Sequence, residues 1–268
     1  MAEQNHYFYP DKNDALISKF ITEKQPFEGY WAKSEKFVLE RMRTLVRTHT
    51  ENRNDAVFLD AGCGTGRLLS EFQEFFKKIV AIDPDRQALE AAKETSRERS
   101  ISEKVIFQNA SIEKFEWQKR SIDVILCSHV LQHVHTDSIM GTIDKLSQLL
   151  SDNGLLLLTT TYSKKDRDFY TKMYCENQRV VEQVVDKNEF NLLINNGNGV
   201  LPVHFFSKKK LLRILSDFGF KMIEFKSFHI LNRMALVDRI IFRDHFVNSL
   251  PLLQGRMGRD MFIACRKI

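Results

Sequence analysis

The stretch from Val57 to Arg67, VFLDAGCGTGR, constrains the fold of this chain more than any other. The apolar run Val57 to Leu59 has the length of a buried strand, and it ends at Asp60 before three glycines at alternate positions. We therefore predict a strand, a tight turn and a helix start. Glycine allows a positive φ and leaves the main chain bare, while a helix start offers unpaired N–H groups. Such a turn suits a ligand with a polar or anionic end, although a glycine turn without any ligand is the alternative.

Composition places weaker limits on the fold and the function of this chain than this motif does. A chain of 268 residues can bury one core, and we favour a single domain with insertions over one domain plus a small cap. The net charge of +5 is the difference between 40 bases and 35 acids, so nucleic acid is not indicated and is not excluded. The four cysteines form no CxxC pair, which suggests neither a zinc site nor a disulfide framework. We expect neither export nor a membrane span, and a cytoplasmic location.

The spacing of the glycines separates two classes of ligand. The dinucleotide fingerprint Gly-x-Gly-x-x-Gly would need a third glycine where Arg67 stands. The spacing Asp60-x-Gly62-x-Gly64-x-Gly66 instead resembles motif I of the class I S-adenosylmethionine (SAM) methyltransferases, whose strand-end acid faces the amino end of the cofactor. An acid suits a ligand with an ammonium and a sulfonium better than one with a pyrophosphate.

This resemblance covers Trp31 to Tyr162 well and the C-terminal strands loosely, and it implies a SAM-dependent methyltransferase. The residues that it places at the cofactor in this first motif are Asp60, Ala61, Gly62, Cys63, Gly64 and Gly66. No acidic cluster matches the metal-dependent catechol-type methyltransferases, so we predict no metal.

Later strand ends supply further predicted cofactor contacts. The run Ile79–Ile82 ends at Asp83, whose carboxylate can accept both hydroxyls of a ribose, with Pro84 beside it. After the third predicted strand the family commonly has an Asp that accepts from the adenine amino group. The best-matching positions here are Ser111 and Ile112, and Asn109 is a rival. After the fourth strand, main-chain carbonyls near Cys127 would meet the ammonium.

Five alternations of strand and helix predict an α/β fold with a doubly wound, mostly parallel sheet. The family implies seven strands with an antiparallel last strand, and we expect a helical lid insertion as well. We divide the chain into an N-terminal arm and cover helix (1–50), a SAM-binding core (51–162), a lid with charged helical stretches (163–206) and a C-terminal part of the core (207–268). The last part carries a helical insertion at 231–250.

Capping residues mark the expected helix starts. Ser34, Asp85 and Ser207 are predicted N-caps, and Thr136 or Asp137 is predicted to cap the helix before the fifth strand. Gly219 is the predicted end of the helix that Ser207 begins.

Methyl transfer from a sulfonium needs orientation, removal of water and, for some acceptors, a base. His133 aligns with a family position that often carries His, and His129 and Tyr162 are further catalytic candidates. A helix-packing or capping role is the alternative for His133. The residues that we expect at the acceptor are Tyr9, Trp31, His204 and Arg233.

We favour a methyltransferase of the ubiquinone-biosynthesis-like type that acts on an O, N or C atom of a small molecule. A methyltransferase acting on tRNA or a protein terminus is one alternative, and a SAM-binding partner subunit without chemistry is another. The sequence does not determine the oligomeric state.

Overall fold

The structure is a computed structural model that describes residues 30–53, 55–177, 179–196, 199–230, 246–250, 253 and 257–268. The predicted acceptor residues Tyr9 and Arg233 lie outside these ranges, as do the arm and most of the predicted insertion at 231–250. Trp31 lies in the first turn of α2, but its side chain is outside the described residues. No helix in these ranges is long and apolar enough to cross a membrane.

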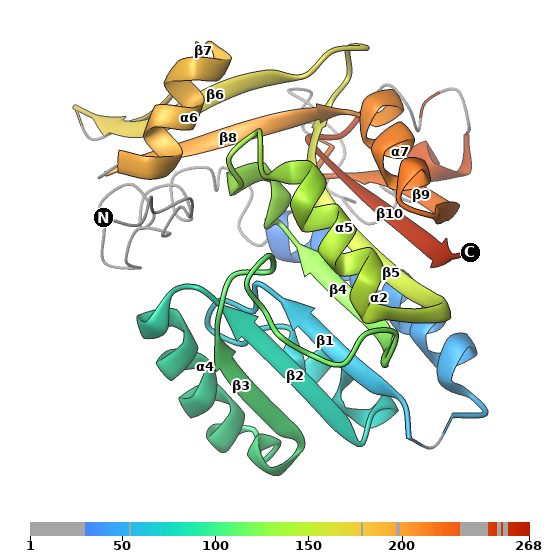
Figure 1. Cartoon of the computed structure of the whole chain (residues 1–268). Coiled ribbons are helices and arrows are strands. Elements are labelled where there is room, and N and C mark those ends of the chain that lie inside the picture. Colours follow the sequence, from blue (N-terminus) through green and yellow to red (C-terminus); the bar gives the residue numbers. More distant parts are fainter. Residues whose placement is uncertain are drawn as a thin grey trace.

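A ten-stranded sheet carries helices on both faces (Figure 1). The strands are β1 (Val57–Ala61), β2 (Lys78–Asp83), β3 (Val105–Asn109), β4 (Ile122–Ser128), β5 (Leu150–Ser163), β6 (Phe169–Glu176), β7 (Arg179–Val185), β8 (Val200–Ser207), β9 (Phe220–Phe228) and β10 (Asp260–Lys267). The helices are α2 (Tyr30–Thr50), α3 (Leu69–Phe72), α4 (Arg86–Glu98), α5 (Ile139–Leu149), α6 (Lys187–Asn196) and α7 (Lys208–Asp217). Short 3-10 turns are η1 (Gln73–Phe75), η2 (Ser102–Lys104) and η3 (Leu131–His133).

Seven strands form the core of the sheet in the order β3-β2-β1-β4-β5-β10-β9. The pairs among β1 to β5 are parallel, whereas β10 runs antiparallel to both β5 and β9. This confirms the predicted mostly parallel sheet with an antiparallel last strand. The chain order reverses between β1 and β4, and open sheets of this kind bind ligands beyond the carboxyl ends of the strands at such a point.

Continuous apolar runs form the central strands because both faces of the sheet are covered. Phe58 and Val124 pack toward α2, α3 and α4, whereas their neighbours Leu59 and Ile125 pack toward α5 and α7. This two-sided burial holds the strand ends in a fixed register, with Asp60 opposite Leu126.

Two of the predicted helix caps are confirmed. The Asp85 carboxylate accepts hydrogen bonds from the main-chain nitrogens of Gln87 and Ala88 at the start of α4. The Ser207 hydroxyl accepts one from Lys210 at the start of α7. Each side chain satisfies donors that have no partner within their helix.

Two other predicted caps are wrong. Ser34 lies inside α2, and its hydroxyl accepts a hydrogen bond from the main-chain nitrogen of His229, 2.8 Å away. Helix α5 begins after Ser138 without a side-chain cap, while the Thr136 hydroxyl is hydrogen bonded to Asn191. Hydrogen bonds to residues distant in sequence, and not helix capping, therefore determine the positions of both hydroxyl groups.

The predicted charged helical stretches at 163–206 are also wrong, except over α6. Strands β6 and β7 form an antiparallel hairpin, and β8 pairs antiparallel with β6. The charged residues mostly occupy exposed positions of this hairpin, and the β-branched pair Val180 and Val181 favours a strand. In Figure 1 these strands and α6 lie on the side of the sheet at which β1, β2 and β4 end. Two ladder pairs, Tyr162–Phe206 and Ser163–Ser207, join β5 to β8, and the Thr161 hydroxyl also donates to the carbonyl oxygen of His204.

Candidate functional site

The three glycines after β1 have positive φ angles, of 86° at Gly62, 51° at Gly64 and 77° at Gly66. A Cβ on Gly62 would lie 2.4 Å from Cγ2 of Val130, and one on Gly66 would lie 3.1 Å from the Cα and Cβ of Ala92. A Cβ on Gly64 would meet no atom within 4 Å. Gly62 and Gly66 are thus required by packing within the protein, whereas Gly64 borders open space that a ligand can enter.

Asp60, the last residue but one of β1, is a buried acid that is only 3% exposed. Burial, and then the charge of Asp83, raise the pKa of Asp60 to about 7, while Arg67 acts in the opposite direction. Among the described residues no hydrogen bond stabilises the carboxylate. A cation placed beside Asp60 would remove this penalty, so the site fits the ammonium end of SAM.

Asp83 ends the neighbouring strand β2, and its carboxylate is fixed by main-chain donors. Its Oδ2 accepts a hydrogen bond from the nitrogen of Gly64, 2.8 Å away, and its Oδ1 accepts one from Asp85, 2.9 Å away. Burial raises the pKa of Asp83, although these hydrogen bonds act to lower it. Each carboxylate oxygen keeps a further lone pair, so the group can still accept from the two hydroxyls of a ribose.

The other predicted cofactor residues follow the next two strands. Ser111 and Ile112 are buried just beyond β3, and the Ser111 hydroxyl accepts from the nitrogen of Lys114. The amide of Asn109, the rival for the adenine contact, donates instead to the carbonyl oxygens of Asp83 and Pro84. The strand ends of β1, β2 and β3 thus bring these predicted residues to one edge of the sheet.

Cys127 lies near the end of β4 and is fully buried. Burial, followed by the charge of Asp60, raises the pKa of its thiol to about 12. The side chain therefore stays protonated, which leaves the main chain of this strand end as the group that can meet a ligand. The other three cysteines are also free thiols. Within the described ranges, no group of three or more His, Cys, Asp or Glu residues could hold a metal ion.

His129 precedes the short turn η3 after β4, and His133 is the last residue of that turn. His129 has a φ of 56°, its main-chain nitrogen donates to Thr159, and its ring lies edge-on to Phe228 with the centroids 6.0 Å apart. His133 is buried, and its Nδ1 donates to the carbonyl oxygen of Pro202 in β8 across 2.7 Å. Burial lowers the pKa of His133 to about 4, so the ring is neutral at neutral pH.

Gln132 connects these two histidines to β5. Its Oε1 accepts from the nitrogen of Thr161 at 3.1 Å and lies 3.2 Å from Nδ1 of His129, while its Nε2 lies 3.2 Å from Nε2 of His133. The hydrogen bond of His133 to β8 extends this network into the 163–206 insertion. A contact of His133 with cofactor or acceptor remains a prediction.

Tyr162 and His204 both pack against aromatic rings. The ring of Tyr162 packs edge-on against Phe225, with centroids 5.9 Å apart, on the face of the sheet that α5 and α7 cover. His204 is 3% exposed and packs among the rings of Tyr170, Phe190 and Phe206.

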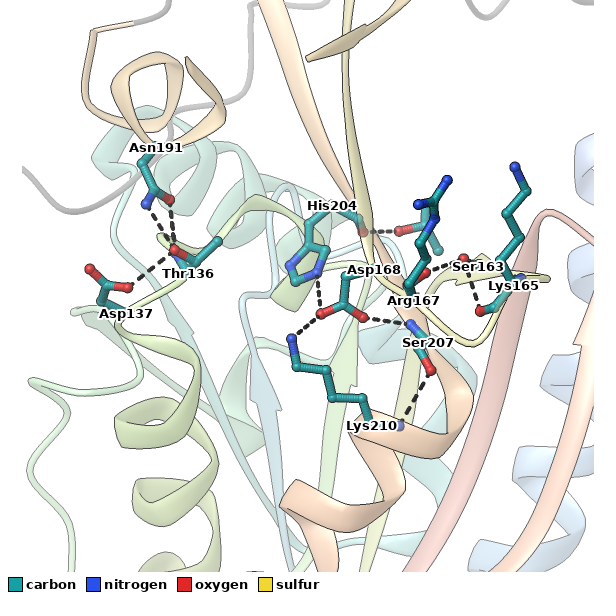
Figure 2. A network of polar contacts seen from close by, with 11 residues as sticks. Thr136, Asp137, Ser163, Lys165, Arg167, Asp168, Asn191, His204, Ser207 and Lys210 are labelled. Atoms are coloured by element: carbon teal, nitrogen blue, oxygen red, sulfur yellow. Dashed lines mark hydrogen bonds and ion pairs between the residues drawn. The ribbon is translucent and has the colours of Figure 1, made fainter. Parts of the chain in front are cut away.

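Figure 2 shows the polar surroundings of His204. Its Nε2 lies 3.3 Å from Oδ2 of Asp168, which also contacts Nζ of Lys210 at 2.7 Å. Neither ring nitrogen has hydrogen-bond geometry toward any described residue, and burial lowers the pKa of the imidazole. The other oxygen of Asp168 accepts from the nitrogen of Ser207. Asp168 therefore ties the insertion to the start of α7, and His204 packs inside the insertion.

The sequence analysis missed a histidine and aspartate pair at the same edge of the sheet. His229 follows β9 with a φ of 52°, and its Nδ1 donates to Oδ2 of Asp260, the first residue of β10. Both side chains are buried. A signal for the pair was present, because the family implies an antiparallel last strand, here β10 beside β9. The residues just after β9 and at the start of β10 must therefore lie side by side.

Helix α2 is held against the glycine turn by a bidentate ion pair. Nη1 and Nη2 of Arg67 lie 2.8 Å and 2.7 Å from the two carboxylate oxygens of Glu35. Bidentate pairs of this kind fix orientation as well as distance. The first turns of α2 therefore stay next to the main chain that follows Gly66.

Comparisons with known proteins agree with this geometry. Residues 30–224 match the family described as a methyltransferase domain. A probable S-adenosylmethionine-dependent methyltransferase of Saccharomyces cerevisiae is 23% identical over 188 residues, or 68% of this chain. The match spans 59% of that relative's length. A ubiquinone/menaquinone biosynthesis C-methyltransferase of Campylobacter jejuni is 25% identical over 193 residues, which cover 66% of this chain and 75% of the relative.

Solved structures of other proteins have a similar fold. One is the 1,6-didemethyltoxoflavin-N1-methyltransferase of Burkholderia thailandensis, crystallised with 1,6-didemethyltoxoflavin and S-adenosylhomocysteine. It superposes with a TM-score of 0.54 over 94% of this chain and 87% of its own, at 17% sequence identity. At this identity the similarity shows a shared fold.

Proposed function

Because the chain belongs to the SAM-dependent methyltransferase family, we propose that it transfers a methyl group from SAM to an O, N or C atom of a small-molecule acceptor. The observation that carries the cofactor part is the open space beside Gly64, which the buried Asp60 and the half-buried Asp83 flank. A ligand that fills this space meets bare main chain, the Asp60 carboxylate, to which no described residue donates a hydrogen bond, and the Asp83 carboxylate, which main-chain donors orient.

We assign the parts of the cofactor to this chain's residues from that arrangement. Asp60 would face the ammonium, and the main chain from Gly62 to Gly66 would pass along the methionine portion. Asp83 would accept from the ribose hydroxyls, and Ser111 with Ile112 would border the adenine. When bound, SAM supplies a methyl group already activated by the sulfonium. The protein then has to orient the acceptor in line with it and exclude water.

The 163–206 insertion and α2 supply the enclosure in this proposal. The insertion contacts the turn after β4 through the hydrogen bond from His133 to Pro202, and α2 is held at the glycine turn by Glu35 and Arg67. Walls on two sides favour a compact acceptor over a polymer. The names of the Campylobacter jejuni and Burkholderia thailandensis proteins, which refer to a quinone pathway and to a toxoflavin precursor, support the same class.

Two measurements test the proposal. Calorimetry with S-adenosylhomocysteine should show saturable binding to the wild-type chain and none to Gly64→Val. The purified chain is then incubated with methyl-labelled SAM and, separately, with tRNA, with protein and with the fraction of a cell extract below about 1 kDa. Label in the small-molecule fraction is the expected result. Label in tRNA or protein would contradict the small-molecule acceptor, and cofactor binding without transfer to any fraction would contradict an enzyme that acts alone.

A further inference from the structure

Exposed basic side chains gather where the insertion joins the core. Ser163, the last residue of β5, pairs with Ser207, the last residue of β8, so the loop after β5 lies beside the first turn of α7. We name five exposed residues of this loop and this helix the basic cluster: Lys164, Lys165, Arg167, Lys209 and Arg213. Figure 2 shows the side chains of Lys165 and Arg167 beside the joint between the two segments.

Hydrogen bonds fix the two segments of the basic cluster relative to each other. The Ser163 hydroxyl donates to the carbonyl oxygen of Arg167 across 2.7 Å, which holds the loop in a tight turn. Asp168, which follows the loop, accepts from the main-chain nitrogen of Ser207 at 2.8 Å and from Nζ of Lys210 at 2.7 Å. The loop and the start of α7 therefore present their cations together.

No described acid pairs with the basic cluster. Its five side chains make neither an ion pair nor a hydrogen bond with any described residue. Asp168 is engaged with the start of α7, which leaves Asp166 as the only other acid of the loop. On α4, by contrast, two bases pair with acids one turn away. Helix α7 has no acid in its first turn, and lysines there oppose the helix dipole, so the arrangement does not serve the stability of the helix.

The surroundings of the basic cluster favour a lipid surface over a protein or a nucleic acid. None of the exposed large apolar side chains of the described residues belongs to it, whereas protein interfaces have an apolar centre in which lysine is depleted. The nearby rings are already covered. Phe169 stacks on Phe205 with the centroids 4.4 Å apart, and Nζ of Lys208 lies 3.6 Å from the ring centroid of Phe225. Single-stranded nucleic acid needs open rings on which its bases stack, whereas anionic lipid headgroups need only exposed cations.

We propose that the basic cluster docks the protein on a bilayer surface that contains anionic phospholipids. The attraction is electrostatic and no side chain of the cluster enters the hydrocarbon, so docking is reversible and is weakened by salt. The loop follows the carboxyl end of β5, so docking brings this edge of the sheet close to the bilayer. The inference goes beyond the proposed function, and its test needs neither cofactor nor acceptor.

Sedimentation of the full chain with lipid vesicles tests the inference. We expect binding to vesicles of phosphatidylcholine mixed with phosphatidylglycerol, no binding to phosphatidylcholine alone, and release at about 0.5 M salt. A loop variant with Lys164→Gln, Lys165→Gln and Arg167→Gln should have a partition coefficient at least about tenfold lower, since each cation near an anionic surface contributes about fivefold. These side chains are exposed and unpaired, so the variant should fold.

Helix α4 provides a matched control, because it packs on the face of the sheet opposite to α7. An α4 variant with Lys93→Gln, Arg97→Gln and Arg99→Gln loses the same charge. It should bind the mixed vesicles within about threefold of the wild-type chain, since charges farther from the surface than a Debye length are screened. Thermal unfolding checks that both variants are folded.

The outcomes separate this inference from its rivals and from the proposed function. Equal binding of the wild-type chain and the loop variant to mixed vesicles, an equal loss in the α4 variant, or no binding to any vesicle would overturn it. Salt-dependent binding of an oligouridylate that the loop variant loses, without binding to vesicles, would assign the basic cluster to nucleic acid instead. A wild-type chain that binds vesicles but not S-adenosylhomocysteine would overturn the proposed function alone.

Discussion

The main-chain nitrogen of Gly64 donates a 2.8 Å hydrogen bond to Oδ2 of Asp83. This bond joins the turn after β1 to the end of β2, two segments 19 residues apart in the chain. The acid that we assign to the ribose and the bare main chain that we assign to the methionine portion therefore move as one unit. The short side chain of Asp83 sets their relative position, since both of its carboxylate oxygens accept main-chain hydrogen bonds.

Replacement of Asp83 tests this unit. We expect Asp83→Ala to lower the affinity for S-adenosylhomocysteine at least about tenfold, since it removes a charged acceptor of two hydrogen bonds. Asp85→Ala is the matched control, because its carboxylate caps α4 and faces solvent. That change should cost about 1 kcal/mol of unfolding free energy and leave the affinity unchanged. Calorimetry and thermal unfolding measure both, and equal affinities for the two variants would contradict the ribose assignment.

Substitutions that add a side chain should have different effects at the different glycines of the turn. Gly64→Val places carbon in open space, so we expect loss of S-adenosylhomocysteine binding with a fold that persists despite strain at positive φ. Gly62→Ala forces a Cβ against Val130 and should destabilise the protein by about 1–3 kcal/mol. Thermal unfolding without ligand separates the two effects. Wild-type affinity in Gly64→Val would show that the cofactor does not occupy this space.

Asp60 makes cofactor binding depend on pH. Its pKa of about 7 means that below pH 7 the carboxyl group of the free protein is mostly protonated, and it must ionise to meet an ammonium. The affinity for S-adenosylhomocysteine should therefore fall by up to about tenfold per pH unit below pH 7. Calorimetry between pH 5 and 8 checks this. Asp60→Asn should bind weakly with a flatter pH profile, and an equally steep profile in that variant would assign the effect to another group.

The same acid should affect the stability of the free protein. Between about pH 4 and pH 7 the folded state keeps a proton on Asp60 that the unfolded state has lost, so stability falls as the pH rises through this range. Asp60→Asn should remove that decline. Urea unfolding of both proteins at pH 5 and pH 7.5 provides the comparison.

His133 should have the opposite effect on stability. Its pKa of about 4 lies below the usual value of 6.5, so the unfolded state binds a proton between these values that the folded state does not. Stability should fall as the pH drops from 6.5 to 4, by about 3 kcal/mol at most. His133→Asn, which keeps a donor for the Pro202 carbonyl, should lose this dependence and be more stable than His133→Ala. A large loss of turnover in His133→Asn without a change in stability would favour contact with the acceptor.

The parts of the fold that the sequence predicted are those with a strong local signal. Apolar runs that end at Asp60, Asp83 and Cys127 predicted the parallel strands, because both faces of these strands are buried. The capping pattern at Asp85 predicted the start of α4, because no distant residue in the described part of the chain accepts or donates a hydrogen bond in competition with the cap. The glycine spacing predicted the turn, although it did not reveal that only Gly64 borders open space.

The rest depends on contacts between distant segments. Ser34 has the chemistry of a cap, but His229, 195 residues away, donates to its hydroxyl instead. The insertion was predicted as helical because its charges mask the alternation of β6 and β7, which is set by pairing with β8. A role of Tyr162 or His204 at the acceptor stays a prediction, because position in the sequence does not reveal on which face of a sheet a side chain packs.

The links between the insertion and the core have an evolutionary consequence. Besides the two residue pairs between β5 and β8, they include the Thr161 hydroxyl with the carbonyl oxygen of His204 and the His133 ring with that of Pro202. A descendant that exchanged this module would lose partners on both sides of the border, so we expect the insertion and the strand ends that it contacts to change together.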